Sequence, residues 1–209
     1  MLKLQDSEAE TTRDKLLACA EMSILLKGFA ATSIEELVAT VGITKSGFFY
    51  HFRDKGEMAR AILDRYVENE KQVFDELFER ADELNEDPLH GFLVFLKMFA
   101  ELMENLPETH PGCIIASYCY QDRLFDDGVR RKTAESLLNW RRRFRSRLDL
   151  IAETYPPKID VDFDGVADMV TSLVDGGIIL SKVVQEKHAL PRQIELYRQF
   201  VRAIFLGTG

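Results

Sequence analysis

The stretch "TKSGFFYHFRDK", residues 44–55, places four aromatic rings and a histidine in five consecutive positions, with basic residues on both sides. A short helix can bury two neighbouring aromatic side chains on one face, but it cannot bury four. At about 100° per residue, Phe48 and Phe52 share one face of such a helix, whereas Ser46 and Tyr50 point away from it. The stretch therefore predicts a short helix that two rings anchor to a core, with its outer face left free.

The preceding residues predict two more helices and a tight turn. One helix is expected over 12–27, and a second starts after Ser33, where "SIEE" has the form of a capping box. Gly42 lies in a short turn, and Thr44 caps the third helix, which runs through Phe52. This order is a helix-turn-helix, a motif whose last helix enters the major groove of DNA.

The outer face of the third helix carries groups that suit a DNA duplex. An ammonium group can reach guanine acceptors, a hydroxyl can bond a base edge, a glycine admits close approach, and a ring can pack on a thymine methyl group. The residues expected to read bases are Lys45, Ser46, Gly47 and Phe49. Those expected to hold the DNA backbone are Tyr50, His51, Lys55, the cap Thr44, and Thr32 and Ser33 at the start of the second helix.

The charge of the chain is unevenly distributed. The formal net charge is −8 and the pI is near 5.1, which by itself argues against wholesale nucleic-acid binding. Within 44–55, however, Lys45, Arg53 and Lys55 against Asp54 leave a local charge of +2. Base reading by one short basic segment is therefore compatible with an acidic protein.

The composition predicts a cytoplasmic protein without a membrane span. Hydrophobic residues make up 46% of the 209 residues, enough for a sizeable core. The start of the chain is polar and acidic, unlike a signal peptide, and Asp and Lys residues interrupt the most apolar stretch, 163–184. Three cysteines without paired spacing suit a reducing compartment.

The segment "GFAATSIEELVATVGITKSGFFYHFRDKGEM", residues 28–58, resembles the DNA-binding motif of the TetR family of bacterial transcriptional regulators. The positions that match the family pattern in order are Gly42-Ile43-Thr44, Phe48-Phe49, His51-Phe52 and Lys55. The pattern commonly has tyrosine at the second aromatic position, where this chain has Phe49 followed by Tyr50. Either of these two residues is therefore a candidate for the phosphate contact.

The fold class expected is all-α, with about nine helices. A three-helix DNA-binding domain over 1–56 is joined by a long fourth helix, from about 54 to 84, to a helical bundle that completes a ligand-binding and dimerisation domain over 57–209. The later helices are expected from Pro88 to about Leu106, within 113–125, over about 127–155, over 162–187, and from Pro191 to about Leu206.

The resemblance implies a homodimer through the last two helices. The helix expected over 162–187 is apolar almost all round, and Gly176-Gly177 permits close helix contact. Two such helices from each subunit would form a four-helix interface, as in the family. The alternative is a helix buried in the core of its own chain.

The resemblance also implies a pocket for a small-molecule inducer. Its candidate lining is Phe95, Phe99, Met103, Cys113, Tyr118, Trp140, Phe144, Met169 and Leu173. Such apolar stripes also form ordinary cores, and Cys113 and Cys119 are either sensors of electrophiles or ordinary buried thiols. The basic run "NWRRRFRSR", 139–147, is either a solvated helix face or a site for an anionic inducer.

Motifs for catalysis are missing from the sequence. There is no Gly-x-Ser-x-Gly elbow, P-loop, His-Glu-x-x-His or dinucleotide glycine fingerprint. His110-x-x-Cys113 has metal-ligand spacing without a second ligand pair, so no metal and no cofactor is expected. The function predicted is a repressor released from a palindromic double-stranded DNA operator by an inducer. The alternative is a helical protein-interaction or thiol-based redox-sensing module without sequence-specific DNA binding.

Overall fold

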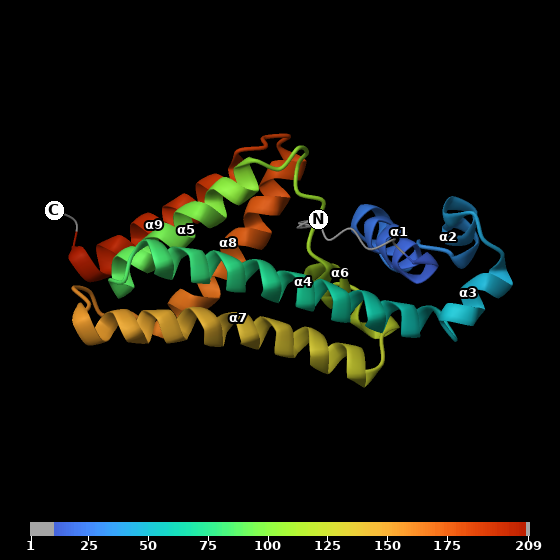
Figure 1. Cartoon of the computed structure of the whole chain (residues 1–209), viewed down its shortest axis with the longest axis horizontal. Coiled ribbons are helices and arrows are strands. Elements are labelled where there is room, and N and C mark those ends of the chain that lie inside the picture. Colours follow the sequence, from blue (N-terminus) through green and yellow to red (C-terminus); the bar gives the residue numbers. More distant parts are fainter. Residues whose placement is uncertain (1–10, 208–209) are drawn as a thin grey trace. The chain divides into compact units, whose positions relative to one another are not determined.

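The computed structural model describes residues 11–207, and this part of the chain is α-helical without a strand (Figure 1). The first five helices are α1 (Thr12–Lys27), α2 (Ile34–Val41), α3 (Lys45–His51), α4 (Lys55–Leu84) and α5 (Pro88–Glu104). The later elements are α6 (Ile114–Cys119), a 3₁₀ turn (Asp122–Leu124), α7 (Asp127–Thr154), α8 (Phe163–Val183) and α9 (Ala189–Leu206). The predicted all-α fold, with nine α-helices in the described residues, is confirmed.

The helices form two compact units. Among the described residues, the first unit comprises 11–71 and 111–136, and the second comprises 72–110 and 137–207. The long helices α4 and α7 therefore each supply residues to both units. The predicted division of roles between 1–56 and 57–209 remains a prediction.

Local sequence explains where the first helices begin and end. Thr11 and Asp14 form a reciprocal capping box at the start of α1. At its end Gly28 has φ of 84°, a backbone conformation that a residue with a Cβ atom rarely adopts, and its N–H donates to the Ile24 carbonyl at 2.8 Å. These contacts fix the predicted bounds of the helix.

The core of the first unit joins α1, α2, α3, the start of α4 and α6. Leu16, Ala20 and Ile24 of α1 are almost fully buried and lie four residues apart, on one face of the helix. Tyr118 of α6 is buried in this core, and its hydroxyl donates to the Ala59 carbonyl of α4 at 3.0 Å. The helix at 114–119 therefore belongs to the same compact unit as the helix-turn-helix.

An aromatic core holds the second unit together. Phe78 of α4 stacks on Phe95 of α5 with ring centroids 3.7 Å apart. The rings linked by contacts in this core are Phe74, Phe78, Phe92, Phe95, Phe99, Trp140 and Phe144. Helix α9 packs on both α5 and α8. Gly177 permits the α8–α9 contact, because a Cβ atom there would lie 2.9 Å from the Leu190 Cα.

Candidate DNA-binding site

The turn between α2 and α3 has the geometry of a helix-turn-helix. Gly42 takes the left-handed conformation, with φ of 77° and ψ of 34°, and its N–H donates to the Val38 carbonyl at 3.0 Å. Thr44 caps α3 as predicted, because its hydroxyl oxygen accepts the Gly47 N–H at 3.1 Å. Cap and turn thereby set the start of α3 within this short segment.

The aromatic cluster divides between the two faces of α3. Phe48 and Phe52 are 0% and 1% exposed, and their ring centroids lie 5.7 Å apart. Phe49 and Tyr50, in contrast, are 47% and 85% exposed. The predicted split into two inward anchors and two outward rings is therefore confirmed. The Phe49 ring also meets Phe48 edge-on at 5.4 Å, which limits how it can turn on the outer face.

The remaining predicted base-reading residues lie at the start of α3. Ser46 is exposed, and Gly47 is half-buried. Lys45 is exposed, and its ammonium group donates to the Glu35 carboxylate of α2 at 2.6 Å. The hydrogen bond from Lys45 lowers the pKa of the Glu35 carboxyl, so this group is ionised at neutral pH. Sequence reasoning did not include Glu35, which lies ten positions before Lys45 and across the turn.

The three remaining backbone-holding residues of α3 and α4 differ in their freedom. Tyr50 is open to solvent, and half-buried His51 meets its ring at 5.0 Å. Lys55 instead donates to the Phe29 carbonyl, and its ammonium lies 4.1 Å from the centre of the Phe29 ring. Burial lowers the pKa of Lys55. Lys55 thus secures the α1–α2 connection, whatever further contact its other N–H donors make.

The predicted phosphate site at the start of α2 needs correction. Thr32 is 1% exposed; its hydroxyl donates to the Gly28 carbonyl at 3.0 Å and lies 3.0 Å from the Ser23 hydroxyl. Its N–H donates to the Phe29 carbonyl, so Thr32 is a buried residue of the turn rather than a group facing DNA. The sequence did not predict this burial, because a threonine next to the N-cap of a helix is normally expected to be exposed.

Ser33 itself is exposed and caps α2, accepting the Glu36 N–H at 3.2 Å. The Glu36 carboxylate, however, pairs with Lys27 of α1 instead of completing the predicted capping box. With Glu35 and Glu36 both in its first turn, α2 presents two carboxylates where an anion site was expected. The α2 start is therefore a poorer phosphate site than the sequence predicted.

The predicted inducer-pocket residues are divided between the two units. Phe95, Phe99, Trp140 and Phe144 belong to the aromatic core of the second unit. Met103 is buried on α5, and Met169 and Leu173 are half-buried on α8. Cys113 and Tyr118 belong instead to the core of the first unit, with Tyr118 stacked 4.3 Å from Phe125. The nine predicted residues thus belong to two different cores, and an inducer pocket lined by them remains a prediction.

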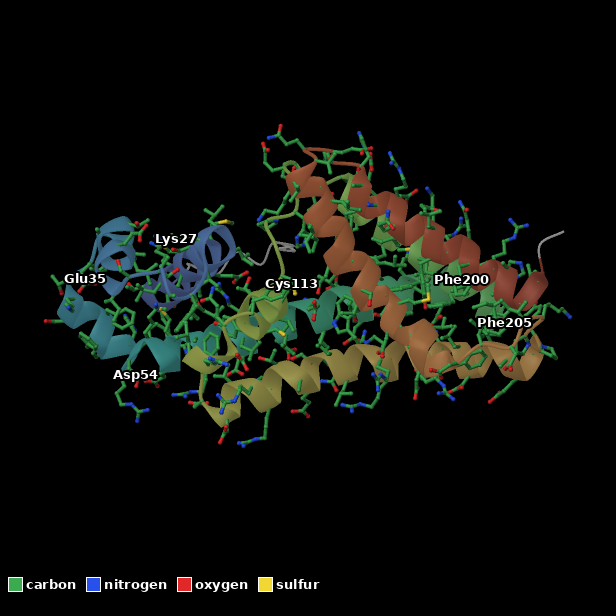
Figure 2. The ribbon with its side chains drawn as sticks, turned by 180° about the vertical axis from the view of Figure 1, so that it is seen from behind. Lys27, Glu35, Asp54, Cys113, Phe200 and Phe205 are labelled. Carbon is green, nitrogen blue, oxygen red and sulfur yellow. The ribbon has the colours of Figure 1, made fainter. Side chains whose placement is uncertain are left out.

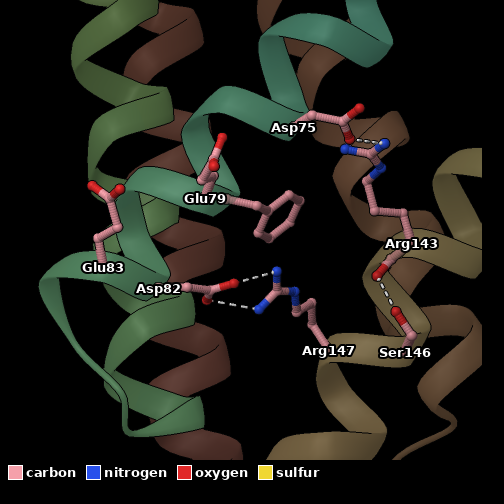
Figure 3. Close-up of a pocket in the computed structure, with 8 residues that line it drawn as sticks. Asp75, Glu79, Asp82, Glu83, Arg143, Ser146 and Arg147 are labelled. Atoms are coloured by element: carbon pink, nitrogen blue, oxygen red, sulfur yellow. Dashed lines mark hydrogen bonds and ion pairs between the residues drawn. The ribbon is translucent and has the colours of Figure 1, made fainter.

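The described residues do contain an open hollow in the second unit, of about 670 Å³. None of the predicted pocket residues lines it; its lining is Asp75, Phe78, Glu79, Asp82, Glu83, Arg143, Ser146 and Arg147. Figure 3 shows Asp75 facing Arg143 and Asp82 facing Arg147 across it, with Glu79 and Glu83 on α4. The hollow is thus polar and bridged by ion pairs, unlike the apolar pocket expected for an inducer.

The basic run on α7 is held by carboxylates of its own chain. Arg147 bonds Asp82 through both terminal nitrogens, each at 2.8 Å, and Arg143 bonds Asp75 at 2.6 Å. Arg141 bonds Asp168 of α8 at 2.5 and 2.8 Å, and Arg145 bonds Asp164 of α8 as well as Asp149 of its own helix. Four of the five arginines therefore tie helices together, which fits neither a bare solvated face nor a free anion site. The guanidinium groups of these four residues are already paired with carboxylates of the chain.

The thiols of the described residues have ordinary surroundings. Cys113 caps α6, its sulfur accepting the Ala116 N–H at 3.4 Å, and Cys119 is exposed. Among the residues described, no cluster of His, Cys, Asp and Glu could hold a metal ion. No helix within 11–207 is long and apolar enough to cross a membrane.

A capped turn, a buried anchor pair and an exposed outer face define a helix-turn-helix regulator as the class of protein. The model of the family "Bacterial regulatory proteins, tetR family" matches residues 16–62, which include α2, α3 and the start of α4. The "Probable HTH-type transcriptional regulator ArpR" of Pseudomonas putida is 30% identical over 104 residues, 49% of this chain and 48% of that protein. This chain thus spans about half the length of that curated relative.

Other likenesses extend over most of the chain. The "Uncharacterized HTH-type transcriptional regulator YxaF" of Bacillus subtilis is 24% identical over 86% of this chain and 89% of its own length. A TetR-family regulator structure from Agrobacterium tumefaciens covers 93% of this chain and 97% of its own, with a TM-score of 0.75 at 16% identity. The reduced form of Escherichia coli NemR covers 95% and 98%, with a TM-score of 0.73 at 19% identity. At 16% and 19% identity, these two solved structures show the fold of the chain and nothing more specific.

The family model thus identifies residues 16–62 as the DNA-binding region of a TetR-family bacterial regulatory protein, and the solved structures show that the whole chain has the fold of such regulators. The chain is accordingly a DNA-binding regulator and not an enzyme. Regulators of this family bind DNA and small-molecule ligands, typically as dimers.

Proposed function

We propose that the chain is a homodimeric repressor that binds a palindromic operator through α3 and leaves it when a small molecule binds. The observation that supports this most strongly is the division of α3, with Phe48 and Phe52 buried and Phe49 and Tyr50 exposed. Because the buried rings of Phe48 and Phe52 fix the inner face of α3, Lys45 and its neighbours lie at defined positions on the outer face. The assigned roles are base reading by Lys45, Ser46, Gly47 and Phe49, and backbone holding by Ser33, Thr44, Tyr50, His51 and Lys55.

The dimer is proposed to form through α8 and α9. Apolar side chains lie exposed along α8 and its end and on α9: Ile179, Leu180, Val183, Val184, Leu196 and Leu206. Gly176 has open space where a Cβ atom would lie, in contrast to Gly177, which α9 already covers. A second copy of the same helices would bury this apolar surface, and two α3 helices would then read half-sites about 34–36 Å apart.

The dimer is tested by sedimentation of the double variant Ile179→Glu, Val183→Glu. The expected result is a folded monomer with strongly weakened operator binding, because two buried carboxylates would oppose the interface. Leu84→Glu, at an equally exposed apolar position on α4, is the control and should stay dimeric. A double variant that sediments like the wild type would overturn this interface.

The inducer is proposed to enter the second unit, among the apolar residues Phe95, Phe99, Met103, Trp140, Phe144, Met169 and Leu173. The four aromatic rings of this set are packed against one another, so the inducer must favour a conformation in which the packing opens. Helix α4 supplies residues to both units, so a shift of its second half is expected to reach the base of the helix-turn-helix. In this proposal residues 1–56 bind the operator, and residues 57–209 bind the inducer and form the dimer. The repressor acts in the cytoplasm.

The proposed activity is tested by selecting duplexes from a random-sequence pool with the purified chain. A repressor of this kind should recover a palindromic sequence, and its affinity should fall steeply with salt. Native mass spectrometry of the purified dimer checks for a co-purified small molecule, whose addition should release the selected duplex. Recovery of no preferred sequence would reject the proposed function.

A further inference from the structure

Each basic residue between positions 27 and 55 has a partner within the chain. Lys27 pairs with Glu36, and Lys45 with Glu35. Arg53 lies 3.4 Å from the Asp54 carboxylate, and Lys55 donates to the Phe29 carbonyl. Three of these four cations are thus paired with carboxylates, in a protein whose net charge is already −8. Figure 2 labels Lys27, Glu35 and Asp54 in this part of the chain.

The pair of Glu35 and Lys45 is the one that involves a proposed base-reading residue. Lys45 is the first residue of α3, the end of a recognition helix that meets base edges. Its ammonium lies 2.6 Å from Glu35, and the two side chains are 58% and 68% exposed. So exposed a pair contributes little to folding, which leaves its position at the recognition helix unexplained by stability.

The pair affects the two kinds of DNA contact differently. A phosphate is drawn to Lys45 by charge, but the Glu35 carboxylate already offsets most of that charge and itself repels a phosphate anion. The O6 and N7 atoms of guanine are uncharged acceptors. An ammonium group has three N–H donors, so two remain for a base edge while Glu35 keeps the third.

We propose that Glu35 is a specificity-determining residue, which withholds Lys45 from phosphates and leaves it able to read a base. The inference rests on the proposed role of α3 in reading an operator. Non-specific binding depends almost wholly on phosphate contacts, whereas specific binding adds base contacts. Glu35 therefore weakens binding to unrelated DNA more than binding to the operator.

Glu36 supplies a matched control within the same helical turn. Both glutamates lie in the first turn of α2, so each contributes equally to the charge at that helix end. Removing either carboxylate changes the net charge of the protein by the same amount. Only Glu35, however, pairs with a residue of α3, because Glu36 pairs with Lys27 of α1.

The test measures binding of wild type, Glu35→Gln, Glu36→Gln, Lys45→Gln and the double variant Glu35→Gln, Lys45→Gln. The probes are a duplex selected from the random pool and a scrambled duplex of the same length and composition. Glu35→Gln should tighten binding to the scrambled duplex more than to the selected one, and should steepen its salt slope by about 0.9, as one added phosphate contact does. The double variant should lose this gain, because the freed ammonium is absent.

The outcomes separate this inference from simpler accounts. Equal tightening on both duplexes, or the same result with Glu36→Gln, would show general charge repulsion and overturn it. A gain that survives in the double variant would overturn it too, as would no change on either duplex. Melting temperatures should stay near that of wild type, so that folding does not confound the comparison. Failure to select any duplex with the wild type would instead reject the proposed function itself.

Discussion

The basic run at 139–147 and the sparser basic stretch at 44–55 place similar charges in opposite surroundings. Arg143 and Arg147 are 26% exposed as side chains; Arg147 bonds Asp82 with two nitrogens, and its guanidinium lies 4.4 Å from the centre of the Phe78 ring. Lys45 is 58% exposed and has one carboxylate partner. The arginines of 139–147 therefore help to hold the helices of their unit together. Lys45 in 44–55, in contrast, can exchange its carboxylate partner for another group.

The comparison teaches that charge density does not locate a DNA-binding surface. An arginine that ties two helices through planar, paired hydrogen bonds is held in that geometry, and its charge is offset by an internal carboxylate. A lysine with a single exposed partner can exchange it when DNA approaches. The folded partners of each cation, rather than the number of cations, distinguish the two regions.

The largest expected effect is on stability, and it comes from removing a buried ring that anchors 44–55 rather than one of its charges. Phe48→Ala should lower the free energy of unfolding by about 3–5 kcal/mol, because it empties a fully buried site behind α3. Denaturant unfolding measures this loss. Phe49→Ala, on the exposed side of the same helix, serves as the control and should cost far less. Equal losses would show that α3 does not divide its faces as described.

The next effect concerns the dense run. Arg147→Gln should lower the free energy of unfolding by about 1–2 kcal/mol, because Asp82 loses its paired partner at a partly exposed position. Operator affinity measured well below the melting temperature should not change. Arg142→Gln removes the same charge from the exposed side of α7 and should leave the melting temperature unaltered. An Arg147→Gln variant that weakened DNA binding without loss of stability would contradict the framework role.

Lys45→Gln should show the reverse pattern. Its loss removes only an exposed ion pair, so the melting temperature should not move, while binding to the selected duplex should weaken by about 1–3 kcal/mol. Fluorescence anisotropy with the selected duplex measures this change. Unaltered affinity would show that Lys45 does not contact the operator, and that the two basic regions do not differ in DNA binding.

The smallest effect on folding separates Phe49 from Tyr50. Phe49→Ala should change which sequences are selected, because its ring is proposed to meet a thymine methyl group. Tyr50→Phe should weaken binding about equally on all sequences, because it removes a hydroxyl proposed to hold a phosphate. Selection with each variant compares them. The opposite pattern would exchange the roles of the two residues.

Much of the framework could be read from short-range patterns. The predicted start and end of the first helix, the turn at Gly42 and the cap at Thr44 all occur in the structure. Each depends on residues within one or two turns of one another, which a sequence displays directly. The inward placement of Phe48 and Phe52 follows from the same local geometry.

Contacts between residues far apart in the chain could not be predicted from the sequence. Arg143 meets Asp75 from 68 positions away, and no pattern of charge marks that partnership. Tyr118 shares apolar spacing with the pocket candidates, but α6 packs beside α1 and so carries it into another core. Thr32 turned inward because its hydroxyl completes the α1–α2 connection.

The sequence by itself determined the class of fold, the helix-turn-helix and the face that α3 turns outward, because helical period, caps and glycine turns act over a few residues. Only the tertiary structure decided which charges are available. Whether Lys45 or Arg147 can meet DNA depends on the carboxylates that folding brings beside it. An ion pair forms between groups that are neighbours in space, and the fold alone sets that neighbourhood.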